Sequence, residues 1–300
     1  MTLTELRYII AVARERHFGK AAEACHVSQP TLSVAVRKLE ETLGVALFER
    51  NKHEVQLTPI GSAIVQQAQQ ILDEVALLNT LARQGQDQLA GPLRLGAIYT
   101  IGPYLFPQLI SRLHQLAPKM PLVIEENFTA ILRDRLINGQ LDVIIISLPF
   151  SHPGLQTKVM YDEDFVVLLP KEHALAKRKT IDATALNNEN VMLLGEGHCF
   201  RDQVMAACPG CVPTSLDGTT HVVEGSSLET IRHMVATGMG ITVLPRLAST
   251  QPYYNADLLV TRPFTAPAPT RQIALAWRKS FPRPKVIDIL EQAVQSCGIQ

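Results

Sequence analysis

The chain has 300 residues, of which 46% are hydrophobic, and its 28 Lys and Arg side chains balance its 28 Asp and Glu. That length allows two or three domains with sizeable cores, and the balanced charge excludes a polyanion-binding surface over the whole molecule while leaving room for a local one. The apolar runs are short and the first residues lack the regions of a signal peptide, so no membrane segment is predicted and the cytoplasm is the expected location.

The N-terminal segment has the pattern of a winged helix-turn-helix. Apolar residues at positions 3–13 recur at helical spacing, and small residues at 20–24 predict a second, short helix. Ser28 is a suitable N-cap for a third helix that runs to about residue 41, and Pro30 lies in its first turn, where a missing N–H costs little. Residues 43–58 alternate in polarity, which predicts a hairpin wing.

One long helix is predicted from Pro59 to about residue 88. Its apolar residues step by four and three positions, as in a coiled-coil seam. They are Ile64, Ala68, Ile71, Val75, Leu78 and Ala82. Because the segment joins two domains and has little of its own chain to pack against, the pattern favours a seam between two copies. The alternative is a helix packed on its own domain.

After Gly91-Pro92, short apolar strands alternate with helices, which predicts βαβ units and a parallel sheet. Strands are expected at residues 93–98, 122–126, 143–147, 165–169, 191–194, 240–244 and 273–277, and helices at 103–117, 129–138, 226–237 and from about Pro284. The last elements are expected to return to the first block. Two lobes joined by crossing strands would leave a ligand cleft at the strand ends.

The third helix offers side chains typical of a DNA-recognition helix. Residues 1–60 hold eight Lys and Arg against seven Glu, a net charge of +1, so basic side chains would have to gather on one face. Gln pairs bidentately with adenine, Ser and Thr reach bases or phosphates, and Arg and Lys suit phosphates. The predicted DNA-binding residues are Ser28, Gln29, Pro30, Thr31, Ser33, Arg37, Lys38, Arg50 and Lys52. The alternative is a small packing module whose polar residues are only solvated.

Three of the five cysteines, Cys199, Cys208 and Cys211, lie within 13 residues. In a reducing compartment such a group indicates transient thiol chemistry rather than a structural disulfide. A redox-reactive cysteine must be a thiolate, and a helix N-terminus lowers the pKa of a thiol. Cys199 stands where a helix to about residue 207 is predicted to begin. His198, Arg201 and Asp202 could supply positive charge or hydrogen bonds, and the alternative is a buried, inert cysteine.

The spacing of the cysteines predicts a switch. Cys208 is nine positions after Cys199, so one continuous helix would hold their Cα atoms roughly 13 Å apart. A disulfide needs Cα atoms within about 7 Å, so oxidation must melt or bend the segment. The expected path is a sulfenic acid at Cys199, unwinding, and attack by a resolving cysteine. Cys211, in a turn after Pro209-Gly210, is a second candidate for that role.

The chain resembles the LysR-type transcriptional regulators over its full length. The resemblance rests on Phe18-Gly19-Lys20-Ala21-Ala22, Val27-Ser28-Gln29-Pro30-Thr31-Leu32-Ser33, Lys38-Leu39-Glu40 and Leu47-Phe48-Glu49-Arg50. Within that family it is similar to hydrogen-peroxide sensors at residues 100–105, 197–203 and 227–230 and at Cys208. The resemblance implies a homotetramer, a dimer of dimers, that binds double-stranded promoter DNA, works with RNA polymerase and activates antioxidant genes after oxidation by hydrogen peroxide.

The same resemblance assigns roles to individual residues. It favours Cys208 over Cys211 as the resolving cysteine, with Cys199 as the peroxidatic one. It implies that Thr100, Thr129, His198, Asp202 and Arg271 bind or activate peroxide. Helix capping is the alternative for the two threonines, and a surface position at a strand edge is the alternative for the arginine. No cofactor and no metal are expected.

The predicted architecture is therefore α/β in three parts. A winged helix-turn-helix takes residues 1–58, a linker or dimerisation helix takes 59–90, and a two-lobed, periplasmic-binding-protein-like regulatory domain takes 91–300. Lobe I comprises residues 91–162 and 266–300, and lobe II comprises 163–265.

Three other functions compete with a peroxide-sensing regulator. His198, Cys199, Cys208 and Cys211 could form a zinc site, because Cys208 and Cys211 have zinc-ligand spacing, but His198 and Cys199 are adjacent and their side chains would diverge. A regulator with a small-molecule effector in the cleft is the second, and a thiol peroxidase is the third. Cys25, among alanines, is expected in a core, and Cys297 has no visible partner.

Overall fold

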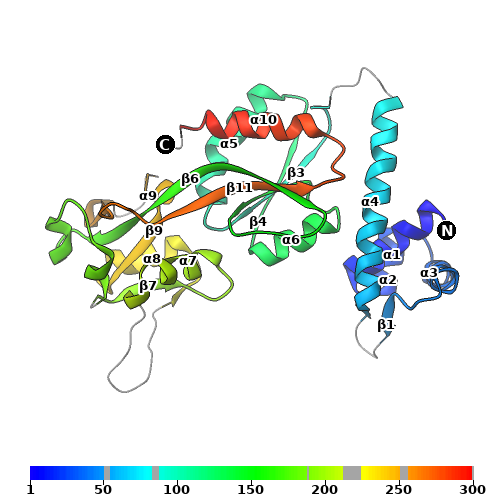
Figure 1. The fold of residues 1–300 in the computed structure, drawn as a ribbon, viewed down its shortest axis with the longest axis horizontal. Coiled ribbons are helices and arrows are strands. Elements are labelled where there is room, and N and C mark those ends of the chain that lie inside the picture. Colours follow the sequence, from blue (N-terminus) through cyan, green and yellow to red (C-terminus); the bar gives the residue numbers. More distant parts are fainter. Residues whose placement is uncertain (51–54, 83–87, 188, 212–223, 251–255, 299–300) are drawn as a thin grey trace.

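A computed structural model describes residues 1–50, 55–82, 88–187, 189–211, 224–250 and 256–298. Figure 1 shows three bodies in a row: an N-terminal head with a long helix, a middle lobe, and a second lobe at the far end. Each body has its own cluster of buried hydrophobic residues. Within the described ranges, no helix combines the length and hydropathy needed to cross a bilayer.

The head has the predicted helix-turn-helix and wing. It consists of α1 (Leu3–Glu15), α2 (Phe18–Ala24), α3 (Gln29–Leu43) and the antiparallel hairpin β1 (Phe48–Arg50) and β2 (Val55–Leu57). The second helix begins at Phe18, two residues before its predicted start. The reason is local, because the His17 ring accepts hydrogen bonds from the backbone N–H groups of Gly19 and Lys20 and so caps the helix.

The linker helix α4 (Pro59–Ala82) ends before residue 88, which lies in a turn. Ala68 is buried in the core of the head, and Ile64 and Ile71 pack against that core. The premise that α4 has little of its own chain to pack against is therefore wrong for its first half. Further along, Leu78 is 65% exposed, so a seam between copies has an apolar side chain available there and stays a prediction.

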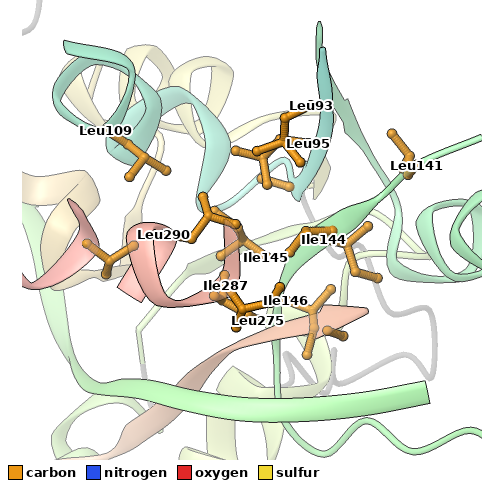
Figure 2. Packing of buried hydrophobic residues seen from close by; sticks show 14 of the residues in the cluster. Leu93, Leu95, Leu109, Leu141, Ile144, Ile145, Ile146, Leu275, Ile287 and Leu290 are labelled. Atoms are coloured by element: carbon orange, nitrogen blue, oxygen red, sulfur yellow. The ribbon is translucent and has the colours of Figure 1, made fainter. Parts of the chain in front are cut away.

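Lobe I holds a parallel sheet covered by helices. The strands β3 (Leu93–Ile98), β4 (Leu122–Asn127) and β5 (Val143–Ser147) pair in the order β4-β3-β5. The helices are α5 (Gly102–Leu116), α6 (Thr129–Ile137) and α10 (Pro284–Gln295). Figure 2 shows how the two buried strands β3 and β5 meet Leu109 of α5 and Ile287 and Leu290 of α10.

Two long antiparallel strands, β6 (Leu155–Pro170) and β11 (Thr270–Arg278), join the lobes. The sequence predicted only the last part of β6. Its first part carries Asp162, Glu163 and Asp164, which pair in register with Gln272, Arg271 and Thr270 of β11. Because these pairs are polar, this part of the strand has no apolar periodicity from which it could be predicted. The predicted parallel sheet is confirmed for β3, β4 and β5. It does not extend to β11, which runs antiparallel to β5.

Lobe II continues the sheet as β6-β9-β7-β8, with β10 on the other side of β6. Its strands are β7 (Val191–Leu194), β8 (Glu224–Gly225), β9 (Ile241–Pro245) and β10 (Leu259–Pro263). Its α-helices are α7 (Cys199–Ala207), α8 (Leu228–Ala236) and α9 (Arg246–Thr250). In its described residues, 3-10 helices lie at Ala174–Lys177, Ala183–Leu186, Pro209–Cys211 and Ala256–Leu258.

Candidate thiol site and DNA-binding surface

The chain turns from β7 into α7 at Gly197, whose φ of +90° is in the left-handed region. A Cβ at this position would lie 3.3 Å from the Phe128 ring, so glycine allows both the turn and the close approach to lobe I. His198 follows as the N-cap, but its side chain makes no capping bond. Cys199 is the first residue of α7 and is partly exposed.

The imidazole of His198 is buried against two aromatic rings that also contact each other. Its centroid lies 4.8 Å from that of Phe128 and 5.9 Å from that of Tyr99. Burial lowers the pKa of His198, and a hydrogen bond to the backbone of Ser226 opposes this only in part. The neutral ring is therefore favoured. His198 contributes packing and a hydrogen bond to the site rather than the positive charge considered from the sequence.

Cys199 borders a small cavity between the lobes. The cavity has a volume of about 10 Å³ and is lined by Ile98, Tyr99, Thr100, Asn127, Phe128, Thr129, Gly197, His198 and Cys199. That is roughly the space of one water-sized molecule. Four of the predicted site residues thus meet at one place: Thr100, Thr129, His198 and Cys199. Tyr99 and Phe128 complete the wall and were missed, because aromatic residues near strand ends are ordinarily core.

The two threonines differ in their hydrogen bonds. Thr129 is the first residue of α6, and its buried Oγ1 has no hydrogen-bond partner within the described structure. Thr100 Oγ1 accepts a hydrogen bond of 2.8 Å from Arg271, so its own O–H is left to donate. Neither hydroxyl caps a helix, because α5 and α6 have Ile101 and Phe128 as N-caps without side-chain bonds. A small polar molecule in the cavity would find a hydroxyl from each.

Arg271 holds Thr100 in place. It is 3% exposed, which rules out the alternative of a surface arginine. Its guanidinium also donates to the backbone oxygen of Thr100 at 3.0 Å and forms a buried ion pair with Glu163 at 2.7 Å. Glu163 in turn accepts a hydrogen bond from the backbone of Leu247 in α9. Sequence reasoning missed Glu163, because a lone carboxylate gives no sign that it is buried beside an arginine 108 positions away.

Two predicted neighbours of the thiol point elsewhere. Asp202 is exposed, and it does not line the cavity. Arg201 donates to the Leu194 carbonyl at 2.9 Å and pairs with Glu224 of β8. Gln203 of the same helix instead reaches lobe I, where its Nε2 donates to Ser147 Oγ at 2.8 Å.

Cys208 lies at the opposite end of α7. It is the C-cap residue, is 1% exposed and belongs to the core of lobe II, whereas Cys199 packs against the core of lobe I. Both are thiols rather than halves of a disulfide. The nine helical residues from Cys199 to Ala207 separate their Cα atoms by roughly 13 Å, beyond the limit of about 7 Å for a disulfide. The side chain of Cys211 lies outside the described residues.

One face of α7 anchors the helix in lobe II. Phe200, Val204 and Cys208 recur at intervals of four residues and are all buried in the same cluster. The ring of Phe200 packs edge-on against Phe165 at 5.0 Å, and the Arg271 guanidinium lies 5.0 Å from the same ring. A disulfide between the ends of α7 therefore requires this face to leave its core.

The remaining cysteines lie apart from the cavity. Cys25 packs against the core of the head, as predicted, and burial raises the pKa of its thiol. Cys297 donates a hydrogen bond to the Ala293 carbonyl, and burial raises its pKa as well. In the part of the chain that the structure describes, no three His, Cys, Asp or Glu side chains gather closely enough to hold a metal ion.

Helix α3 and its N-cap present six of the nine predicted DNA-binding residues to solvent. Ser28 caps the helix by accepting a hydrogen bond from the Thr31 backbone at 3.3 Å. The exposed residues are Ser28, Gln29, Pro30, Thr31, Arg37 and Lys38, and Ser33 is half-buried. Val34 of the same helix is 66% exposed, although an apolar helical residue is normally assigned to the core. Arg50 is the last residue of β1, but its side chain is not among the described ones. Lys52 lies outside the described residues.

The fold and the site define a class of protein, a DNA-binding regulator with a sensor domain. Its parts are the head, the linker helix and the two-lobed domain that carries the thiols. A family model for bacterial regulatory helix-turn-helix proteins of the lysR family matches residues 3–62, and the LysR substrate binding domain matches residues 86–298. The chain belongs to the LysR family.

Within that family, the chain is similar to proteins named OxyR. It is 39% identical to the DNA-binding transcriptional dual regulator OxyR of Escherichia coli K12, over 99% of this chain and 95% of that protein. The structure of full-length OxyR C199D from Pseudomonas aeruginosa matches with a TM-score of 0.87 and 55% identity, covering 100% of this chain and 96% of that one. The reduced OxyR regulatory domain from P. aeruginosa matches at 54% identity with a TM-score of 0.65, covering 71% and 98%.

Proposed function

We propose that this chain is a hydrogen-peroxide-sensing transcriptional activator. The observation that carries the proposal is the thiol of Cys199 at a cavity of about 10 Å³, between the hydroxyls of Thr100 and Thr129. Hydrogen peroxide is close to water in size and offers donors and acceptors to both hydroxyls. The names of similar proteins support the same function, since several are hydrogen peroxide-inducible genes activators, one of them 40% identical.

The chemistry has two steps. The sulfur of ionised Cys199 attacks one peroxide oxygen, the O–O bond breaks, and the leaving hydroxide takes a proton to become water, which leaves a sulfenic acid. The Cys208 sulfur then attacks the Cys199 sulfur, and the S–O bond breaks with release of a second water. Two thiols are oxidised to one disulfide while one peroxide is reduced to two waters. Thr100, held by Arg271, and Thr129 would position the peroxide.

The structural consequence follows from the place of Cys208. For the second step, α7 must unwind and withdraw Phe200, Val204 and Cys208 from the lobe II core. A nine-residue helix without a side-chain N-cap is suited to this, because short helices depend on packing. The lobes would then repack, and the heads of a homotetramer, a dimer of dimers, would change their spacing on promoter DNA and their contact with RNA polymerase.

A second candidate function has one observation in its favour. An open groove of about 920 Å³ lies beside α7, lined in part by Phe150, Phe165, Gln203, Ala207 and Pro269. It is large enough for a metabolite-sized effector, as small-molecule sites usually are. A regulator that used this groove would respond to its effector and would be insensitive to peroxide.

One promoter fragment tests the proposal. Three proteins are footprinted on it, each in the reduced and the peroxide-treated form: wild type, Cys199→Ser and Cys297→Ser. The last is the matched control, because Cys297 is a partly buried thiol outside the site. The footprint should change length on oxidation in wild type and in Cys297→Ser only. An identical change in Cys199→Ser would reject Cys199 as the sensor. Peptide mapping of the oxidised protein distinguishes a Cys199–Cys208 bond from Cys199–Cys211, and steady-state peroxide consumption separates a sensor from a thiol peroxidase.

A further inference from the structure

A buried ion pair holds the linker helix on lobe I. Asp73, in the middle of α4, accepts a hydrogen bond of 2.7 Å from Arg278 Nε at the end of β11. Ser280 donates to the same carboxylate oxygen at 2.8 Å, and Gln69 donates to the other at 3.0 Å. Both charged residues are buried. Such a pair contributes little to the free energy of folding, because the cost of desolvating both charges offsets much of their attraction. Stability alone therefore does not account for it.

Arg278 also binds the far end of α6. Its NH1 group donates to the carbonyls of Leu136 at 2.6 Å and Leu141 at 2.7 Å. The adjoining surface is shaped for α4 by two glycines with positive φ. A Cβ on Gly139 would lie 2.8 Å from the Gln69 side chain, and one on Gly154 would lie 2.9 Å from that of Gln66. The contact between α4 and lobe I is therefore close and specific.

Two elements run from the peroxide cavity to this ion pair. β11 carries Arg271, which is bonded to Thr100, near one end and Arg278 at the other. The seven positions between them span about 23 Å of extended chain. The second element, α6, begins at Thr129 in the cavity and ends beside the Leu136 carbonyl that Arg278 holds. Figure 1 shows α4 standing beside the ends of β11 and α6 that lie away from lobe II.

The head itself faces lobe I across an open space. A groove of about 570 Å³ is lined by Arg16 and Gln56 of the head and by Asp134 and His152 of lobe I, among others. Among the described residues, the buried ion pair that joins the N-terminal part of the chain to lobe I lies on α4. A movement of α4 against lobe I would therefore change the position of the head.

We infer that Asp73 and Arg278 transmit the redox state of the cavity to the DNA-binding head. The inference rests on the proposed peroxide-sensing function. When α7 unwinds, Phe200 leaves the guanidinium of Arg271, and β11 and α6 shift with the cavity. Arg278 is hydrogen-bonded both to Asp73 of α4 and to the Leu136 carbonyl of α6. Because of these bonds, that shift moves α4 and reorients the head. Asp73 and Arg278 are positioning residues in this scheme, since they touch neither peroxide nor DNA.

The test uses full-length Asp73→Asn, which keeps the shape and removes the charge, and Glu74→Gln as the control for an exposed carboxylate one position away. Two quantities are measured: the rate of Cys199–Cys208 disulfide formation, and the ratio of promoter affinities of oxidised and reduced protein. Asp73→Asn should form the disulfide at the wild-type rate while its affinity ratio falls about tenfold, the scale of a typical allosteric coupling. Glu74→Gln should keep both.

A milder variant, Ser280→Ala, removes one bond to Asp73 and decides the matter if Asp73→Asn does not fold. It should lower the affinity ratio in the same direction by a smaller factor. A full wild-type ratio in either folded Asp73→Asn or Ser280→Ala would overturn the inference and leave the peroxide chemistry intact. Absence of a disulfide in the wild-type protein would instead overturn the proposed function, and this inference with it.

Discussion

The helix expected to contact DNA, α3, and the helix that carries the thiols, α7, are built in opposite ways. α3 has 15 residues, a side-chain N-cap from Ser28, a proline in its first turn and Gly44 in the left-handed conformation after its last residue. α7 has nine residues, an N-cap histidine that makes no capping bond, and Cys208 as its C-cap. Capping residues in the local sequence define both ends of α3. Helix α7 lacks a side-chain N-cap and is stabilised mainly by packing against the lobe II core.

This difference matches the two tasks. A recognition helix must hold its side chains at fixed positions, so determination by local sequence is an advantage. A sensor helix that must unwind on oxidation should be stable only while its buried face is in place. On the proposed function, helix α7 would be the bistable element of the switch.

The largest expected effect comes from removing a buried side chain of α7. Phe200→Ala deletes a buried ring of α7 and should lower the free energy of unfolding by about 3–5 kcal/mol, measured by urea denaturation. Unfolding of α7 should then be easier, so the disulfide should form faster after Cys199 is oxidised. Leu32→Ala in the buried face of α3 is the matched change. It should weaken DNA binding and leave disulfide formation unchanged, and a slower disulfide in Phe200→Ala would contradict this view of α7.

Arg271 supports the cavity wall and the Phe200 ring together. Arg271→Met leaves the Glu163 carboxylate buried without its cation, so the free energy of unfolding should fall by about 3–5 kcal/mol, and the rate of Cys199 oxidation should fall too. The control is Arg246→Met, whose exposed pair with Asp164 contributes about 0–1 kcal/mol. Denaturation curves and peroxide-reaction rates of both variants provide the check. Equal losses in the two would show that burial of the pair is unimportant.

A pair of glycine substitutions sharpens the comparison without touching a core. Ala206→Gly in α7 and Ala35→Gly in α3 each remove about 1 kcal/mol of helix stability. The first should speed disulfide formation severalfold at unchanged DNA affinity, and the second should lower DNA affinity at unchanged disulfide formation. Stopped-flow thiol kinetics and promoter titrations measure the two effects. If both variants changed both properties, the two helices would not be independent.

The smallest expected effect concerns pH. Burial lowers the pKa of His198, so below its ordinary value of about 6.5 the unfolded chain binds a proton that the folded chain excludes. The stability contributed by the neutral ring is therefore present above that pH and is lost as the pH falls from that value through the lower pKa of the folded state. Thermal midpoints from pH 7.5 to 5.5 should decline more steeply in wild type than in His198→Gln. Parallel declines would show that other groups cause the pH dependence.

The sequence predicted the elements that local signals define. Caps and periodicity located α1, α3 and α4, and continuous apolar runs located β3, β5, β7 and β9. The first part of β6 was missed because its acidic residues are stabilised by pairing with β11, to which no local pattern refers. The 3-10 helices of lobe II were missed for a related reason, since single turns carry no periodicity.

For the site, residue types and a family resemblance located Thr100, Thr129, His198, Cys199 and Arg271, which the fold brings together or links through hydrogen bonds. Asp202 and Arg201 are neighbours of Cys199 in sequence but turn away from the cavity, because successive residues of a helix point in different directions. Glu163 and the pair of Asp73 and Arg278 could be found only in the folded chain, since their partners are distant in sequence.

By itself the sequence determined where α1, α3, α4 and α7 begin, which face of α3 is polar, and how far along the chain two thiols lie from one another. Only the tertiary structure decided that Cys199 packs against one lobe and Cys208 in the core of the other, that Arg271 is buried on Glu163, and that α4 is held by Arg278. The reason is that caps and periodicity act over a few residues, whereas burial and ion pairing join segments that meet only when the sheet has formed.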